Sequence, residues 1–169
     1  DGDLMEGVSQ EAASLAGHLG LDNIIYFYDD NDISIGGSTD LAFTEDVPAR
    51  FRAYNWHVQE IDGHDMDAID GAIRAAKAAK GQPHISVCHT HIAYGSPNMH
   101  DDAEAHGAPL GEEEVRLTKE ALDWPSQEPF WLPEDVLAHY RLAVPQGEQA
   151  EAIWRDMLTH YQQEYKDEA

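Results

Sequence analysis

Three short runs with the composition of β-strands constrain the fold more than any other feature of this chain. They are rich in β-branched and aromatic side chains and cover residues 24–28, 56–61 and 84–90. Stretches with the apolar spacing or the start and stop signals of helices lie at residues 5–19, 48–54 and 65–80. Strands that alternate with helices are typical of a parallel sheet. We therefore predict an α/β fold with a partial parallel sheet flanked by helices.

The chain changes character after the third of these strands. Residues 91–111 show no clear periodicity, and a loop of this length in a compact domain is usually functional. Beyond it, helical patterns cover residues 112–122, 133–142 and 146–165. The sequence therefore predicts that a helical tail follows the sheet.

The charge of the chain excludes some classes of partner. The 33 acidic residues outnumber the 10 Lys+Arg, giving a net charge of -23. Such a field repels phosphate backbones, so we expect no nucleic-acid partner. A salt-adapted surface explains the acidity most simply, and an acidic face that binds a partner is the alternative.

The chain also lacks the usual signals of export. No run is long enough to cross a membrane, and no secretory leader is present, so we expect no membrane partner. A single cysteine, Cys88, excludes an internal disulfide and fits a reducing compartment. We therefore expect a cytoplasmic protein.

Oxygen-bearing side chains cluster at two points that a parallel sheet would bring to one edge. Asp1-Gly2-Asp3 precedes the first helix, and residues 29–32, with sequence DDND, follow the first strand. Ligands of open parallel sheets bind beyond the carboxyl ends of the strands. Magnesium prefers carboxylate, amide and phosphate oxygens, and a helix amide end can hold a phosphate. A magnesium-bridged diphosphate fits this pattern, while ordinary capping and turn roles are the simpler alternative.

The same residues resemble the thiamine diphosphate motif in the variant found in transketolases. The resemblance begins with DGDLMEGVSQEAASLAGHLGL and IIYFYDDNDISI, and it continues through FTEDVPARFRAYNWHV, IDGHD, AYGSPN and HGAPLG. It implies a thiamine-diphosphate-binding fold, with a diphosphate-binding domain at residues 1–125 that lacks its N-terminal strands. Residues 126–169 fit more loosely a helical linker toward the next domain.

The resemblance also implies a cofactor site. Thiamine diphosphate would be held through Mg²⁺, or through Ca²⁺ or Mn²⁺ in its place. Asp1, the Asn31 side chain and the Ile33 backbone carbonyl would bind the metal, and Gly2 and Asn31 would belong to the cofactor site. Asp32 stands where the family often has glycine, and it receives no role.

Three further residues match catalytic positions of the family. His106, in HGAPLG, matches a histidine that contacts both the diphosphate and the terminal hydroxyl of the substrate. Glu6 and Glu11 match acidic residues that join the two active sites of a dimer through a chain of glutamates. Without the resemblance, solvated helix charge would be the preferred interpretation of both glutamates.

The remaining histidines are expected to be mostly surface or core residues. His89 and His91 are two residues apart at the end of an expected strand, and His100 is close in sequence, so a second metal site is an alternative. His64 is expected to make a turn or core contact. The stretch 99–105, MHDDAEA, is acidic where the family is commonly basic, which would weaken phosphate attraction there.

Taken together, the resemblance implies a transketolase, a homodimeric transferase of the pentose phosphate pathway. The complete enzyme would move a two-carbon ketol unit between sugar phosphates, and this chain alone is expected to be inactive. The alternative of a relative such as a deoxyxylulose-phosphate or dihydroxyacetone synthase is less well matched by GSPN and HGAPLG. The alternatives of another class are a truncated, non-catalytic paralogue and one subunit of a split transketolase.

Overall fold

The computed structural model describes residues 1–169, which form two compact units at residues 1–125 and 126–169. In the first unit, three parallel strands form a sheet in the order β1-β5-β4. They are β1 (Ile25–Asp30), β4 (His57–Asp62) and β5 (His84–His89). The predicted α/β fold with a parallel sheet is therefore confirmed.

The central position of β5 in the sheet explains the apolar sequence from which a strand was predicted. It pairs with a neighbour on each side, and all of its residues except the last are buried. Ile85 and Val87 lie in the core, where Val87 is 0% exposed. A strand covered on both faces must be nearly apolar throughout, because neither face meets water.

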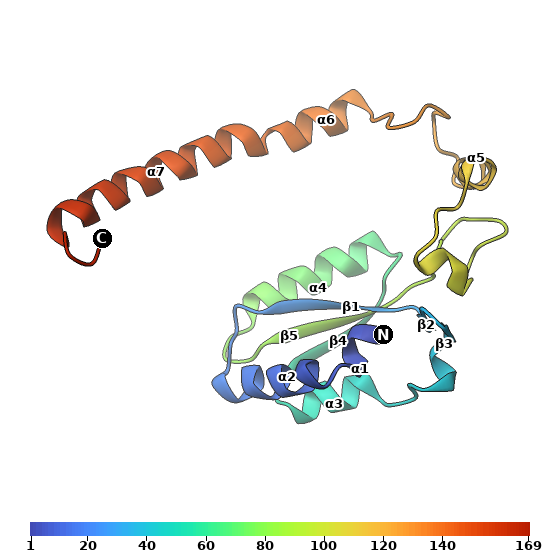
Figure 1. The fold of residues 1–169 in the computed structure, drawn as a ribbon, viewed down its shortest axis with the longest axis horizontal. Helices are drawn as coiled ribbons and strands as arrows, with labels where there is room; N and C mark the ends of the chain where they lie inside the picture. Colours follow the sequence, from blue (N-terminus) through green and yellow to red (C-terminus); the bar gives the residue numbers. More distant parts are fainter. The chain divides into compact units, whose positions relative to one another are not determined.

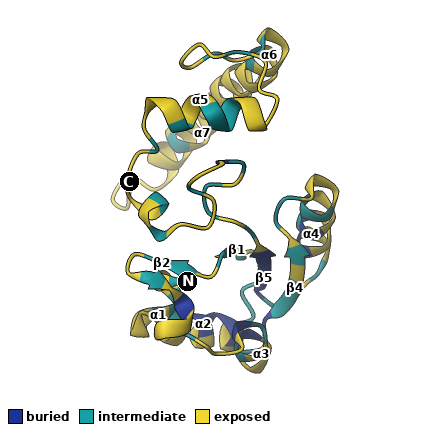
Figure 2. Cartoon of the chain, turned by 90° about the vertical axis from the view of Figure 1, so that its right-hand side faces the viewer, coloured by how far each residue is buried: buried dark blue, intermediate teal, exposed yellow.

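Helices cover both faces of this sheet (Figure 1). The helix α4 (Met66–Ala78) lies on one face, and α2 (Gly7–Leu19) and α3 (Val47–Ala53) lie on the other. Burial is concentrated in β5 and on the helix surfaces that face the sheet, as Figure 2 shows. Asp46 and Asp65 begin α3 and α4, where each carboxylate accepts backbone N–H groups of the first turn.

Small residues let α2 approach the rest of the unit closely. The indole Nε1 of Trp56 donates to the carbonyl of Ala13 at 2.8 Å. Ala13, Ala16 and Gly17 are buried, and Gly17 lies directly against the backbone carbonyl of Tyr54. The small residues of this helix therefore serve packing within the chain.

The structure corrects three details of the sequence prediction. The helix expected at 5–19 is interrupted at Glu6, whose extended backbone (ψ 130°) separates α1 (Gly2–Met5) from α2. Asp29 and Asp30 belong to β1, because they continue its ladder opposite Cys88 and His89. No element was predicted between the strand at 24–28 and the helix at 48–54, but this segment contains a hairpin and a 3₁₀ turn: β2 (Ile33–Ser34), β3 (Gly37–Ser38) and η1 (Thr39–Leu41).

The other predicted elements agree closely with the structure. The long loop after β5 contains the 3₁₀ turn η2 (Ala103–His106) and leads into α5 (Glu112–Ala121). The second unit contains α6 (Glu134–Arg141) and α7 (Ala143–Glu164), neither of which has a buried residue. No helix has both the length and the hydropathy that crossing a bilayer would require.

The contact at Gly17 predicts a selective loss of stability. A Cβ at this position would lie 1.7 Å from the Tyr54 carbonyl oxygen, so Gly17→Ala forces α2 away from its partner. We expect the complete protein to lose about 2 kcal/mol or more, because overpacking outweighs the better helix propensity of alanine. Gly71→Ala in α4 is the control, since its Cβ would meet no atom within 4 Å. Thermal melts in which both variants behave alike would contradict the packing argument.

Candidate functional site

The candidate site lies at the edge of the sheet where all three strands end. Asp1 at the chain start, the β2–β3 hairpin and the loop after β5 come together at this edge (Figure 1). This is the edge at which ligands of open parallel sheets bind.

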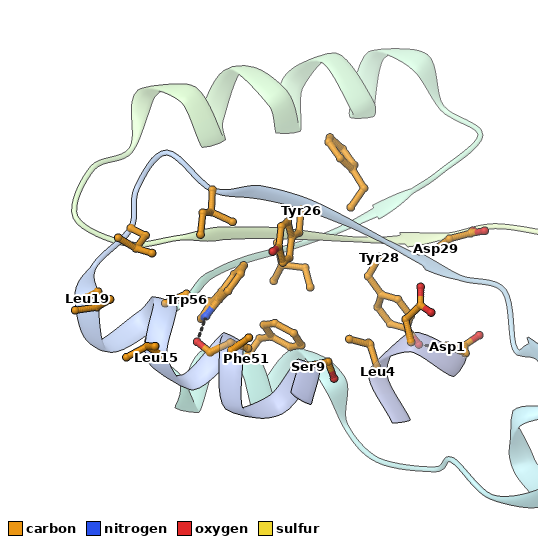
Figure 3. A pocket seen from close by; sticks show the side chains of 18 residues that line it. Asp1, Leu4, Ser9, Leu15, Leu19, Tyr26, Tyr28, Asp29, Phe51 and Trp56 are labelled. Atoms are coloured by element: carbon orange, nitrogen blue, oxygen red, sulfur yellow. Dashed lines mark hydrogen bonds between the residues drawn. The ribbon is translucent and has the colours of Figure 1, made fainter. Parts of the chain in front are cut away.

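Two carboxylates share one phenol at the centre of this edge. The Tyr28 hydroxyl lies 3.0 Å from Oδ1 of Asp30. It also hydrogen-bonds to Oδ1 of Asp1, as Figure 3 shows. A phenol has one proton, so it cannot fully satisfy both carboxylates at once. Asp30 gains a second partner in His89, whose Nδ1 lies 2.9 Å from its Oδ2.

Electrostatics keep the proton on Tyr28. Burial is the main cause, and the neighbouring charge of Asp30 adds to it, so the pKa of the Tyr28 hydroxyl lies far above its ordinary value. Tyr28 is therefore a permanent hydrogen-bond donor to these carboxylates. The other oxygen of Asp1, Oδ2, is buried and has no hydrogen-bond partner. An orphaned carboxylate oxygen of this kind is costly unless a cation or donor compensates it.

A cavity of about 340 Å³ opens beside Asp1. Its walls carry the acidic side chains of Asp30, Asp32, Asp40 and Glu45 as well as that of Asp1. The structure therefore brings Asp1 together with Asp30 and Asp32. It does not join Asp1 by a hydrogen bond to Asn31 or Ile33, the other residues that were assigned to the metal.

Asn31 organises the turn between β1 and the hairpin. Its Oδ1 accepts the backbone N–H of Ile33 at 3.1 Å, and its Nδ2 donates to Asp29 at 3.2 Å. Thr90 hydrogen-bonds to the other oxygen of Asp29 and so ties the turn to the end of β5. Asp32 has a φ of +60°, in the left-handed region, which accounts for the glycine that the family often has there.

The donors at this edge are suited to a hard cation. Mg²⁺, Ca²⁺ and Mn²⁺ prefer carboxylate, amide and carbonyl oxygens. Asp1 offers a buried oxygen without a partner, and the Asn31 amide oxygen keeps a second lone pair beside the one used by Ile33. Gly2 is exposed, and no atom lies within 4 Å of the position that a Cβ would occupy, so a ligand can approach its backbone. The residues present therefore fit the metal and diphosphate that were expected.

His106 lies at the end of η2 with its side chain exposed. Asp102 fixes the start of this turn by accepting the Glu104 N–H at 2.8 Å. η2 lies against β2, so the segment that carries His106 is next to the one that carries Ile33. Two segments assigned to the site from the sequence are thus neighbours in space.

Glu6 and Glu11 are not drawn into this site. Glu6 lies at the interruption between α1 and α2, Glu11 lies within α2, and both side chains are exposed. The glutamates have no ion-pair partner in the chain.

Sequence analysis missed Tyr28, the pairing of Asp30 with it, and Thr90 as parts of the site. The signal for the first two was present, because residues two apart on a strand point to the same face. Tyr28 and Asp30 therefore had to lie together wherever β1 continued past residue 28. No pattern along the chain pointed to Thr90, whose role follows from the pairing of Asp29 with Cys88 in the neighbouring strand.

Comparisons with known proteins agree with this geometry. The family described as "Transketolase, thiamine diphosphate binding domain" matches residues 1–169. The transketolase of Nostoc sp. is 52% identical over 171 residues, which cover 100% of this chain and 25% of that protein.

Solved structures give the same result. The transketolase of Campylobacter jejuni superposes with a TM-score of 0.85 at 41% identity, over 94% of this chain and 25% of that one. A transketolase of Pichia stipitis, solved as a complex with sedoheptulose-7-phosphate, gives a TM-score of 0.84 at 41% identity, over 99% of this chain and 25% of that one. The chain thus spans about a quarter of the length of these relatives. It belongs to the transketolase family, and it corresponds to the thiamine diphosphate-binding domain of that family.

Proposed function

We propose that the complete protein is a transketolase that transfers a two-carbon ketol unit between sugar phosphates. Membership of the family carries this proposal, together with the buried, unpartnered oxygen of Asp1 at the first position of the motif. The sugar phosphate bound by the Pichia stipitis relative supports this class of substrate. This reaction would take place in the cytoplasm as part of the pentose phosphate pathway. Residues 1–125 would form the later part of the diphosphate-binding domain, and residues 126–169 would lead to the next domain.

The metal site would be built from three residues of this chain. Asp1, the Asn31 side chain and the Ile33 carbonyl would bind Mg²⁺, or Ca²⁺ or Mn²⁺ in its place, and Gly2 and Asn31 would face the diphosphate. Tyr28 would fix the orientation of Asp1, since its hydroxyl already holds one of the two carboxylate oxygens. Thiamine diphosphate, when bound, supplies the carbanion chemistry, and the protein supplies its position and charge balance.

His106 would act at the substrate side of the site. An imidazole can donate or accept a proton near neutral pH, so it suits a group that holds both a diphosphate oxygen and a substrate hydroxyl. Its exposure on η2, beside the β2 segment, supports an approach from the open edge of the sheet.

The complete protein would be a homodimer, with Glu6 and Glu11 joining its two active sites. Ala13, Ala16 and Gly17 of α2 do not support this proposal, because they are buried within the chain itself. Its support comes instead from the outer side of α2, where Val8 is 70% exposed beside these glutamates. Carboxylates buried in such an interface would have to share protons or find donors.

Removing the Asn31 side chain tests the metal site. We expect Asn31→Ala in the complete protein to weaken thiamine diphosphate binding by at least about 10- to 100-fold, the loss typical even for residues that only support metal ligands. Calorimetric titration of the cofactor at saturating Mg²⁺ measures this change. Asp32→Gly is the matched control, because glycine keeps the left-handed backbone of the same turn. Unchanged affinity in the Asn31 variant would show that this residue holds neither metal nor cofactor.

Removing the His106 side chain tests catalysis. His106→Ala should lower kcat by about 10²- to 10⁴-fold, the usual contribution of a general acid or base, and it should raise KM. The fold should survive because the side chain is exposed and leaves no core cavity. His139→Ala on α6 is the control for an exposed histidine outside the site. Steady-state rates equal to those of the control would remove His106 from the mechanism.

The oligomeric state tests the role of α2. Light scattering should show the complete protein as a dimer, and Val8→Arg should shift it toward monomer, because a charge would be buried at the interface. Met66→Arg is the control, since Met66 is 73% exposed at the start of α4, on the opposite face of the sheet. A fully active monomer would refute the proposed assembly.

A further inference from the structure

A second group of possible ligands lies in the loop after β5, away from the oxygens of Asp1 and Asn31. It consists of His91, His100 and Asp101, which we call the histidine cluster. One ligand atom of each residue lies within 4.8 Å of those of the other two. The Asp101 Oδ2 lies 3.0 Å from His91 Nδ1 and 3.4 Å from His100 Nε2.

These separations suit a tetrahedral metal ion. Zinc bonds to nitrogen and oxygen measure about 2.0–2.2 Å, so two ligand atoms of a tetrahedral site lie about 3.3–3.5 Å apart. The 3.4 Å distance from Asp101 to His100 falls in this range, and the 3.0 Å distance from Asp101 to His91 is a few tenths of an ångström shorter. A metal ion could therefore enter with small side-chain movements, and all three residues are exposed to solvent.

The backbone of the loop holds the cluster together. Asp101 donates its N–H to the carbonyl of Ile92 at 3.0 Å, which closes the loop between them. Asp101 adopts a φ of +57°, a left-handed conformation that aspartate and asparagine tolerate better than most residues. The imidazoles of His91 and His100 stack with their centroids 4.8 Å apart. The cluster is thus formed by a closed loop, not by freely moving side chains.

A neighbouring segment anchors one end of this loop. The backbone N–H of His91 donates to Nε2 of His64 at 3.0 Å, and the His64 ring stacks on Tyr94 at 4.0 Å. His64 lies between β4 and α4, so this contact ties the loop to the end of a second strand. Since its Nε2 accepts this hydrogen bond, that nitrogen of His64 is not free to serve as a fourth ligand.

We propose that His91, His100 and Asp101 bind a divalent transition metal ion of the zinc type, with water completing its coordination. Two imidazoles and one carboxylate are ligands that Zn²⁺, Co²⁺ or Ni²⁺ accept, whereas Mg²⁺ prefers oxygen alone. His89 is not part of this cluster, since its ring lies against Asp30 and only the ligand atoms of His91, His100 and Asp101 come together. The alternative metal site in the sequence analysis consisted of His89, His91 and His100. The site proposed here contains Asp101 in place of His89.

The ion would brace the loop that leads to η2. It would join residues 91 and 100–101 across the loop, only a few positions before His106. Asp102 and Glu104 follow at once and add negative charge, which raises the local concentration of cations. This inference does not depend on ketol transfer, because it rests on the cluster alone.

Calorimetric titration of ZnCl₂ into the complete protein tests the site. Saturating Mg²⁺ fills oxygen sites, and about 1 M KCl shortens the Debye length to about 3 Å, which suppresses loose binding to the acidic surface. The wild-type protein should bind one Zn²⁺ per chain that His100→Ala and Asp101→Asn each weaken by at least about 10-fold. Asp101→Asn keeps the left-handed backbone, so its loss of binding cannot be ascribed to a misfolded loop.

His160→Ala is the matched control. His160 is also an exposed histidine near a carboxylate, 3.6 Å from Asp156 on α7, but no second imidazole joins this pair. Its variant should bind Zn²⁺ like the wild type. Hydrogen exchange in residues 91–101 should slow on adding Zn²⁺ to the wild type and not to Asp101→Asn. The proposal would be overturned if the wild-type protein bound no Zn²⁺. It would also be overturned if all variants bound Zn²⁺ equally, which indicates an adventitious ion only.

Discussion

The parallel pairing of β5 with both of its neighbours is the constraint on which the rest of the first unit depends. Its register sets Asp30, His89 and Asp62 in one row across the end of the sheet. Because all three strands run in the same direction, every segment that leaves them starts at this edge. The Asn31 turn, the His64 turn and the loop to His106 are therefore neighbours for one reason. If one strand were shifted by one residue against its neighbour, the side chains of that strand would point to the opposite face of the sheet.

This arrangement gathers negative charge at the edge, where Arg50 balances part of it through its ion pair with Glu45. Asp1 and Asp30 share the single proton of Tyr28, and one oxygen of Asp1 has no partner. Folding against such repulsion has a cost, and natural proteins keep a cost of this kind chiefly at functional sites. A bound cation would remove the cost, so cofactor binding and local stability are expected to be coupled. The orphaned oxygen thus gives the family motif a physical meaning in this chain.

The sequence predicted most of the elements and the edge at which the site forms, because periodicity and strand composition act over short stretches. It did not predict that Glu6 interrupts a helix, because the apolar spacing continues from Met5 to Val8 across this point and a single glycine such as Gly7 is tolerated within helices. It also ended β1 two residues early, because the polar side chains of Asp29 and Asp30 hide a ladder that depends on Cys88 and His89. The contact of Asp101 with His91 was also missed. It depends on how the loop closes on itself, and a loop has no periodic pattern in the sequence.

Asp1 also lies at one end of an apolar groove on the surface of this chain. A largely apolar cavity of about 580 Å³ runs between α2 and β1, and Asp1 and Tyr28 line one end of it (Figure 3). Beside it, Tyr26 is 53% exposed, and β1 has no partner on its outer edge. Apolar area of this kind is stabilised when it is covered, and an unpaired edge strand invites another strand. A segment that covered this groove in the complete protein would lie beside Tyr28, which holds Asp1. The geometry of the proposed metal site would therefore depend on the sheet of this chain and on whether the groove beside it is covered.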